Sequence, residues 1–348
     1  MHQLLKSILT TKRAHNSTGE LNFLKWLHDH LKDLGCKPQA MAEGCIVVEN
    51  GPNKVLFSCH VDTVHNTAVS DGSMQELFVD TAMGHVFTAN PPVSGCLGAD
   101  DGAGIYVLLR MLAANVPGTY IFHRGEERGG IGANGMLNKH AKWLEQFTQC
   151  VAFDRAGKED IILTQGGQMC ASAAYGDALS KALAGQGLKY ANCHKGSFTD
   201  SKVYRQIIRE CINLSVGYEQ QHGPGEYLDY EHLELLTAAA IKLEWEKLPV
   251  SRNIVPDMPK FQPNYGRSID GDDGFLGYKK PSSVASIKPK KLKVPPPMPE
   301  AEDLEHMNYE EIFEWTGDET LTEAICSLMI KNAELEARAD MYRQLVGL

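Results

Sequence analysis

The sequence predicts an α/β fold, a mixed and largely parallel central sheet with helices on both faces. Short apolar runs of strand length alternate with segments of helical periodicity, and this alternation is typical of a parallel sheet with crossover helices. The runs are apolar at nearly every position, as expected for strands covered on both sides. The chain has 348 residues, of which 43% are hydrophobic and 8% aromatic, enough to bury a sizeable core.

The individual elements follow from local patterns. The first helix is predicted to begin at Ser17, which forms a capping box with Glu20, and leucines then recur at helical spacing to Leu31. The predicted strands are 45–48, 55–59, 119–123, 150–154 and 211–216. The further predicted helices are 101–114, 130–138, 200–207 and 230–248.

Proline divides the chain into three parts. Ten of the 16 prolines lie between Pro249 and Pro299, which predicts a flexible linker over 249–300. Residues 1–248 are then one α/β domain, and 301–348 form a helical tail. A second capping box begins at Thr320, and an apolar repeat with Asn332 at an a-like position follows it. Two interpretations stay open: a helix that packs on the main domain, or weak self-association through 320–346.

Composition excludes several classes of protein. Lys and Arg number 34 against 44 Asp and Glu, a net charge of −10 that argues against a nucleic-acid partner. No apolar run is long enough to span a membrane, and the N-terminus lacks the pattern of a signal peptide, so we expect a cytoplasmic protein without membrane contact. The nine cysteines form no CxxC pair, which indicates reduced thiols.

Ionisable residues follow the predicted strands where each strand ends, and ligand sites in α/β sheets lie at those ends. Taken singly, each has an ordinary explanation: a hydrogen-bonded histidine, a turn or helix cap, or a solvated acid pair. Together, two histidines and several carboxylates at one rim would repel unless cations neutralised them. The residues at these strand ends are His60, Asp62, Asp100, Asp101, Glu126, Glu127, Asp154 and His222.

The ligand types indicate which metal. Histidine and carboxylate without cysteine suit a catalytic zinc-type centre, and an excess of carboxylate suits two ions about 3.5–4 Å apart. Asp62, two residues after His60, can orient the histidine ring. Zinc is the first choice, although cobalt and manganese tolerate the same ligands.

The ordered motifs resemble those of the co-catalytic dizinc exopeptidases and amidohydrolases, which include peptidase T, aminoacylase, glutamate carboxypeptidase and bacterial zinc aminopeptidases. The resemblance covers about residues 15–248. Its motifs are CHVDTV (59–64), LGADDGAGI (97–105), GEERGGIGA (125–133), FDRAG (153–157) and HGPGEYLD (222–229).

The resemblance implies a role for each residue of the motifs. One ion would be held by His60, Asp100 and Asp154, and the second by Asp100, Glu127 and His222, with Asp100 bridging. Glu126 would be the general base and Asp62 would orient His60, while a cis peptide would join Asp100 to Asp101. The block SFTDS (197–201) would place Thr199 and Asp200 at the rim, and a helix cap explains them equally well.

The sequence departs from the peptidase T and aminoacylase branch in one respect. Those relatives insert a lid domain between the ligands equivalent to Asp154 and His222, and here the interval is too short for one. An open site with an acidic rim favours recognition of a free α-amino group, so the first prediction is an aminopeptidase that cleaves small peptides. The alternatives are an N-acyl amino acid deacylase, a carboxypeptidase, or a binding or scaffold protein that retains the metals.

Overall fold

A computed structural model of the chain describes residues 1–254. The predicted tail 301–348, the segment 320–346 and nearly all of the linker 249–300 lie outside the described residues. Within the described part, the main sheet has the strand order β1-β2-β6-β3-β7-β12-β8-β11. These strands are β1 (Gln39–Ala40), β2 (Ile46–Asn50), β3 (Val55–His60), β6 (Gly118–His123), β7 (Gln149–Arg155), β8 (Asp160–Ile162), β11 (Ala191–Cys193) and β12 (Glu210–Ser215).

Strand pairing confirms the predicted mixed sheet. The centre is parallel, since β3 pairs in parallel with both β6 and β7, and β7 pairs in parallel with β12. Antiparallel pairs lie further out, at β1 with β2, β2 with β6, and β12 with β8. The parallel centre carries the carboxyl ends of β3, β6 and β7 to one edge, which is where a ligand site is expected.

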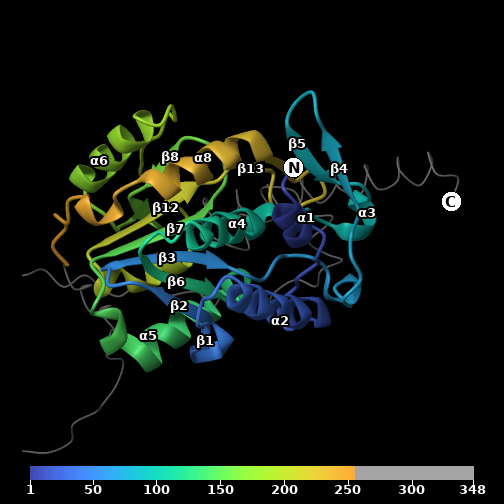
Figure 1. The fold of residues 1–348 in the computed structure, drawn as a ribbon, viewed down its shortest axis with the longest axis horizontal. Helices are drawn as coiled ribbons and strands as arrows, with labels where there is room; N and C mark the ends of the chain where they lie inside the picture. Colours follow the sequence, from blue (N-terminus) through green and yellow to red (C-terminus); the bar gives the residue numbers. More distant parts are fainter. Residues whose placement is uncertain (255–348) are drawn as a thin grey trace, which may run out of the picture. The chain divides into compact units, whose positions relative to one another are not determined.

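Helices cover both faces of this sheet, as predicted (Figure 1). The helix α4 packs on β3 and β7 and also contacts α1 and α8, whereas α7 contacts the same strands and α5. The helices are α1 (Gln3–Leu9), α2 (Thr18–Asp33), α3 (Pro91–Ser94), α4 (Ala99–Ala113), α5 (Ile131–Leu144), α6 (Ala173–Ala184), α7 (Asp200–Val203) and α8 (Tyr230–Lys242).

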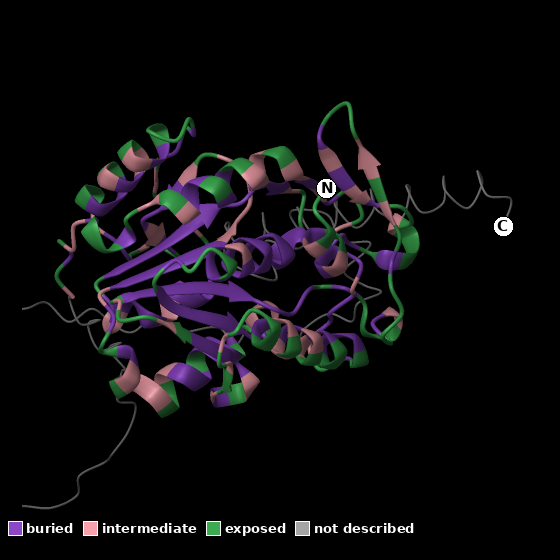
Figure 2. Ribbon diagram, viewed as in Figure 1, coloured by how far each residue is buried: buried purple, intermediate pink, exposed green. Residues whose placement is uncertain are grey.

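The core forms two clusters, one on each side of the sheet. Along β3, Val55 and Phe57 belong to the larger cluster, and Leu56 between them belongs to the smaller one. The central strands β3, β6 and β12 are therefore buried along their whole length, and β7 is buried except at its last two residues (Figure 2). Alternate side chains of a strand point to opposite faces, so an unbroken apolar run supplies both clusters at once.

A smaller antiparallel sheet lies beside the ends of the central strands. Its order is β13-β14-β5-β4, so it joins the segment after β3 to the segment after β12. Its strands are β4 (Leu77–Asp80), β5 (His85–Thr88), β13 (Tyr218–Glu219) and β14 (Tyr227–Asp229), and a separate pair is formed by β9 (Thr164–Gln165) and β10 (Gln168–Met169). Between Asp154 and His222 the chain forms β8 to β13 with α6 and α7, and no inserted lid domain occurs among these described residues.

The predicted elements agree with the structure except at some ends. Ser17 caps α2 as expected, since its hydroxyl accepts a hydrogen bond from the Glu20 amide at 3.1 Å. The helix predicted over 230–248 is wrong at its end: α8 stops at Lys242, Leu243 is extended, and only a 3-10 turn, Trp245–Lys247, follows. The helix predicted over 200–207 is α7 followed by a 3-10 turn at Tyr204–Gln206.

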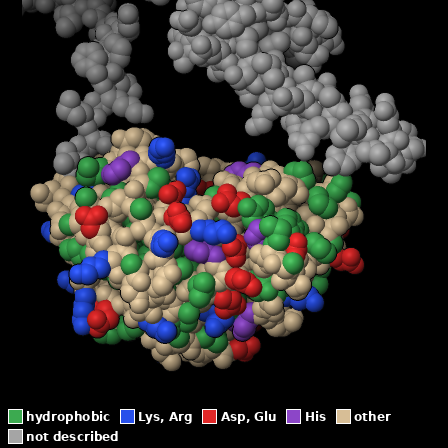
Figure 3. Space-filling view, turned by 90° about the horizontal axis from the view of Figure 1, so that it is seen from above, with side chains coloured by type: hydrophobic (Ala, Val, Ile, Leu, Met, Phe, Trp, Pro, Cys, Tyr) green, Lys and Arg blue, Asp and Glu red, His purple; other side chains and the backbone are tan. Residues whose placement is uncertain are grey.

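Surface and composition expectations can be compared with the described residues. None of their helices has the length and apolarity needed to cross a bilayer. The cysteines of the described part are free thiols. On the face seen in Figure 3, lysine and arginine are interspersed with acidic side chains, and no continuous basic patch is visible there.

Candidate metal centre

The predicted site residues come together at the carboxyl edge of the parallel strands. His60 is the last residue of β3, and Asp154 is the last but one of β7. Asp100 lies in the first turn of α4, and Glu127 lies in the 3-10 turn η3 (Glu126–Arg128) that follows β6. His222 lies in the loop between β13 and β14, with a φ of 65°. Five segments far apart in sequence thus supply one cluster.

Two groups of three potential ligands share Asp100. The first is His60, Asp100 and Asp154, and the second is Asp100, Glu127 and His222. One carboxylate oxygen of Asp100 lies 3.0 Å from His60 Nε2, and the other lies 3.0 Å from His222 Nε2. His60 Nε2 is also 3.4 Å from Asp154 Oδ1, and His222 Nε2 is 2.9 Å from Glu127 Oε1. Asp100 is therefore placed between two histidines.

The ring of His60 is held in a defined tautomer. Its Nδ1 donates to the backbone oxygen of Asp62 at 2.9 Å, which directs Nε2 toward Asp100 and Asp154. Burial alone would lower the pKa of His60, yet the carboxylates of Asp154 and Asp100 raise it well above its ordinary value. The site thus attracts positive charge at Nε2, whether as a proton or as a metal ion.

Asp62 contacts this ring differently from what a carboxylate–histidine pair predicts. Its carboxylate oxygen is 3.8 Å from His60 Nδ1, so its backbone oxygen, not its side chain, holds the ring. The carboxylate instead accepts hydrogen bonds from the amides of Gly125 at 2.6 Å, Glu126 at 3.1 Å and Glu127 at 3.3 Å. The buried Asp62 side chain therefore fixes the turn that carries both glutamates.

Asp154 is held by three neighbours on other segments. The Asn213 side chain binds both the amide and the carbonyl of Asp154, at 2.9 and 3.0 Å. Thr199 donates its hydroxyl proton to Asp154 Oδ2 at 2.5 Å, and Tyr218 donates to the Asp154 carbonyl at 3.2 Å. Burial raises the pKa of Asp154 to about 6. Thr199 occupies the N-cap position of α7 without capping it, because its hydroxyl binds Asp154 instead.

Asp200, the other residue expected at the rim, is buried behind the cluster. Its carboxylate lies 3.2 Å from Nδ1 of His123, the last residue of β6. His123 Nε2 lies 2.6 Å from the Tyr204 hydroxyl. Burial raises the pKa of Asp200 well above its ordinary value and lowers that of His123 to about 3, so both groups are held neutral.

Glu226 is a site residue that was not predicted. It is 1% exposed, and its two carboxylate oxygens accept from the amides of Leu97, Gly98 and Asp100 at 2.8, 3.0 and 3.0 Å. It thereby fixes the backbone at the start of α4, where the expected cis peptide between Asp100 and Asp101 is present. Glu226 belongs to the HGPGEYLD block, four residues after His222, and this proximity was the signal available in the sequence.

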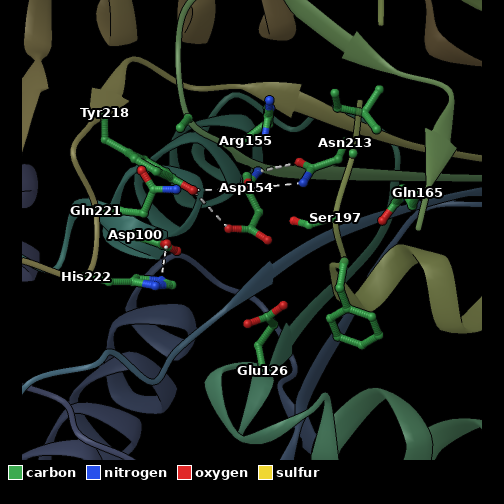
Figure 4. A pocket seen from close by; sticks show the side chains of 14 residues that line it. Asp100, Glu126, Asp154, Arg155, Gln165, Ser197, Asn213, Tyr218, Gln221 and His222 are labelled. Carbon is green, nitrogen blue, oxygen red and sulfur yellow. Dashed lines mark hydrogen bonds and ion pairs between the residues drawn. The ribbon is translucent and has the colours of Figure 1, made fainter. Parts of the chain in front are cut away.

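Glu126 lies across the pocket from Asp154 and carries no hydrogen bond to another described side chain (Figure 4). Burial raises its pKa to about 8, and the carboxylates of Asp154 and Glu127 act in the same direction. A carboxyl group with a pKa near neutral pH, placed beside potential metal ligands, can both accept and return a proton. Glu126 also lies close enough to His60 and Glu127 to form a third potential ligand group with them.

The donor set fits divalent cations. Glu127 Oε1 is buried and lies 2.9 Å from His222 Nε2, and His60 Nε2 lies 3.0 Å from Asp100 Oδ1 and 3.4 Å from Asp154 Oδ1. Two ligand atoms that each lie about 2.0–2.1 Å from a tetrahedral metal lie roughly 3.3 Å from one another, so these separations suit a shared ion. Histidine and carboxylate ligands with open positions are typical of catalytic centres.

The fold and the histidine–carboxylate cluster are those of a metal-dependent hydrolase. Residues 44–222 match Peptidase family M28, and the chain belongs to this family of metallopeptidases. The membership confirms the resemblance to the co-catalytic zinc exopeptidases that the motifs carry. The curated proteins contain no match to the chain.

Solved structures share the fold at low sequence identity. The aminopeptidase PepT of Bacillus cereus is 15% identical, with 69% of this chain and 96% of that chain covered and a TM-score of 0.53. A tripeptidase of Staphylococcus aureus is 14% identical, with 68% and 95% covered and a TM-score of 0.54. The TET1 peptidase of Pyrococcus horikoshii, which can assemble into a tetrahedron or an octahedral shell, is 15% identical, with 70% and 99% covered and a TM-score of 0.51.

Proposed function

We propose that the protein is an aminopeptidase that cleaves small peptides with two divalent cations, zinc first among them. The observation that carries this proposal is the position of Asp100, whose two carboxylate oxygens each lie 3.0 Å from a different histidine. A carboxylate in this position can bridge two ions. His60 and Asp154 would complete the ligands of one ion, and Glu127 and His222 those of the other.

The proposed chemistry divides between the ions and the chain. Two bound dications would acidify a water molecule and polarise the scissile carbonyl. Glu126 then accepts the proton of the attacking water at its carboxylate and returns it to the leaving amine. Asp62 holds the amide of Glu126 and so keeps this carboxylate at the pocket. The positive charge of bound ions would also lower the pKa of Glu126 from its metal-free value, so that it is ionised when it acts.

Substrate class follows from the openness of the site and its acidic rim. No lid domain among the described residues brings a second set of side chains over the cluster. A free α-amino group is cationic and is attracted by the carboxylates of this acidic rim. This favours an aminopeptidase over an N-acyl amino acid deacylase or a carboxypeptidase. The similar folds named as aminopeptidase and tripeptidase agree with this choice.

A substrate panel tests the proposal. Aminoacyl-anilides, N-acetyl amino acids and N-blocked dipeptides are offered to the full chain loaded with zinc, cobalt or manganese. We expect hydrolysis of the anilides and none of the blocked substrates, because only an aminopeptidase needs the free amine. Cleavage of N-acetyl amino acids alone would assign a deacylase. Fewer than one ion bound per chain after loading would favour a scaffold protein.

The role of Glu126 has its own test. Glu126→Gln retains the shape of the side chain but cannot accept a proton, so we expect it to bind both ions and to lose activity by roughly a hundredfold or more. Metal content is measured by elemental analysis and turnover with the best anilide. Glu145→Gln, on the exposed surface after α5, is the matched control. Normal turnover by the Glu126→Gln enzyme would refute the assignment of this residue as the base.

A further inference from the structure

The pocket extends beyond the candidate ligands into a small polar chamber. The whole pocket has a volume of about 90 Å³, and besides the candidate site residues its lining includes Arg155, Ile162, Gln165, Ser197 and Phe198. Among the described residues that line the pocket, Arg155 is the only lysine or arginine. A space of this size, next to the position of the scissile bond, can hold one side chain or one terminal group of a substrate.

Arg155 lies at the opposite end of the pocket from Glu126, with Asp154 between them (Figure 4). Its Nε donates to Asp160 Oδ2 at 3.2 Å. In the described part of the chain, its two terminal nitrogens, Nη1 and Nη2, have no acceptor. The side chain of Arg155 is 29% exposed and that of Asp160 is 35% exposed, so this pair is reachable from the pocket and from solvent. The edge of the guanidinium that remains can bind a carboxylate with two parallel hydrogen bonds.

Gln165 adds a hydrogen-bond acceptor to the same chamber. It is 1% exposed, its Nε2 donates to Ser201 Oγ at 3.2 Å, and its Oε1 is buried without a donor. The amide orientation is set by Ser201, whose hydroxyl proton goes to the Ile212 carbonyl and which can therefore only accept from Gln165. A buried acceptor without a donor costs free energy unless a ligand supplies one.

We propose that this chamber selects substrates that carry a carboxylate about one residue from the scissile bond, bound by Arg155, with an N–H group of the same substrate donated to Gln165. The carboxylate can be an acidic side chain of the first residue or the terminal carboxylate of a dipeptide. This inference rests on the proposed function, because it concerns the substrate of the same site. A plain surface pair between Arg155 and Asp160 would give no such selectivity.

The experiment compares matched substrates on the zinc-loaded full chain. Glu-anilide against Gln-anilide tests the side-chain source of the carboxylate, and Ala-Ala against Ala-Ala-amide tests the terminal source. We expect kcat/KM to be higher for the carboxylate member of at least one pair. The selectivity ratio is the kcat/KM of the carboxylate member divided by that of its uncharged partner. Arg155→Met should lower this ratio roughly tenfold to a hundredfold, the contribution of a charge-assisted hydrogen-bonded pair.

Three further variants separate the roles. Asp160→Asn removes the competing carboxylate and should raise the ratio. Gln165→Leu loses an uncharged acceptor, so it should lower kcat/KM for both members of a pair and leave the ratio unchanged. Arg209→Met, an exposed arginine outside the pocket, is the control and should match the unsubstituted protein.

The outcomes distinguish this inference from the proposed function. If the protein hydrolyses anilides but prefers neither carboxylate member, or if Arg155→Met leaves the ratio unchanged, the carboxylate selectivity is overturned and the aminopeptidase proposal stands. If no member of the panel is hydrolysed with any metal, the proposed function fails and the inference fails with it.

Discussion

Single residues at this site act through the backbone as much as through their own chemistry. The Glu226 side chain contacts the candidate ligand Asp100 only at its backbone amide, and it also accepts hydrogen bonds from the amides of Leu97 and Gly98. Burial raises the pKa of Glu226 to about 7, and the three amide donors favour its ionised form. It therefore positions the bridging carboxylate from behind.

Replacement of Glu226 should weaken metal binding. In Glu226→Gln one oxygen becomes an NH₂ group that faces an amide donor, so at least one buried hydrogen bond is lost. We expect zinc affinity to fall roughly tenfold to a hundredfold, the range for residues that orient metal ligands. Competition with a chromophoric chelator measures this affinity. Glu231→Gln, exposed at the start of α8, should bind zinc as the unsubstituted protein does. An unchanged affinity in Glu226→Gln would remove its positioning role.

At the scale of elements, the turn η3 shows how a short segment is made rigid. It spans only three residues and makes few hydrogen bonds of its own, such as the one from the Gly129 amide to the Glu126 carbonyl at 2.9 Å. The amides of Gly125, Glu126 and Glu127 are held in addition by Asp62 from the loop after β3. The preceding Arg124 is anchored by Glu20 of α2, whose oxygens lie 2.9 and 2.8 Å from its guanidinium. Two distant elements thus determine where Glu126 and Glu127 lie.

Asp62→Asn tests whether the Asp62 carboxylate acts by holding the turn η3 or by orienting the His60 ring. The asparagine NH₂ group faces amide donors, so the turn should loosen and kcat should fall roughly tenfold to a hundredfold at saturating zinc. The His60 ring should keep its hydrogen bond, because that bond is made to the backbone oxygen of residue 62. The ¹⁵N shift of His60 Nδ1 reports on it. A changed His60 shift with unchanged kcat would favour the carboxylate–histidine interpretation instead.

Element boundaries were predictable where a local signal was strong. The Ser17 cap and the apolar strand runs depend on neighbouring residues alone, and the structure places these elements within about two residues of the prediction. The end of α8 at Lys242 was not predictable from periodicity, because the chain turns there so that Trp245 can pack against Phe57 and Phe153. Tertiary packing overrides helical propensity at such a point.

At the scale of the whole molecule, metal binding at the histidine–carboxylate cluster is coupled to the release of protons and to the stability of the fold. Hydrogen bonds to Asp100 and Glu127 raise the pKa of His222 to about 10 in the metal-free protein, and the pKa of His60 is raised as well. These histidines are protonated near pH 7 and must lose the proton to bind a metal. The native interactions of protonated His222 stabilise the metal-free fold below its unfolded pKa and are lost as pH rises through about 10.

The stabilisation by zinc should therefore grow with pH. We expect the difference in unfolding free energy between zinc-loaded and metal-free protein to be larger at pH 8.5 than at pH 6.5, since each proton released strengthens apparent zinc binding about tenfold per pH unit. Urea unfolding at both pH values measures it. The buried thiols of Cys45 and Cys59, whose pKa values are raised by burial, affect both forms alike and cancel in the difference. In His222→Asn the pH dependence should shrink, and an equal dependence would contradict the coupling.

The sequence by itself determined the class of fold and the ligand candidates. Both depend on local order along the chain: apolar runs set the strands, and ionisable residues at the strand ends meet because parallel strands share one edge. Only the tertiary structure decided how these residues are held. Glu226, Asn213 and the backbone oxygen of Asp62 act across loops that no periodicity relates to one another. Arg155, the one arginine or lysine among the described residues that line the pocket, reaches it only when β7 and β8 are folded. Contacts of this kind arise from packing, which a single sequence does not display.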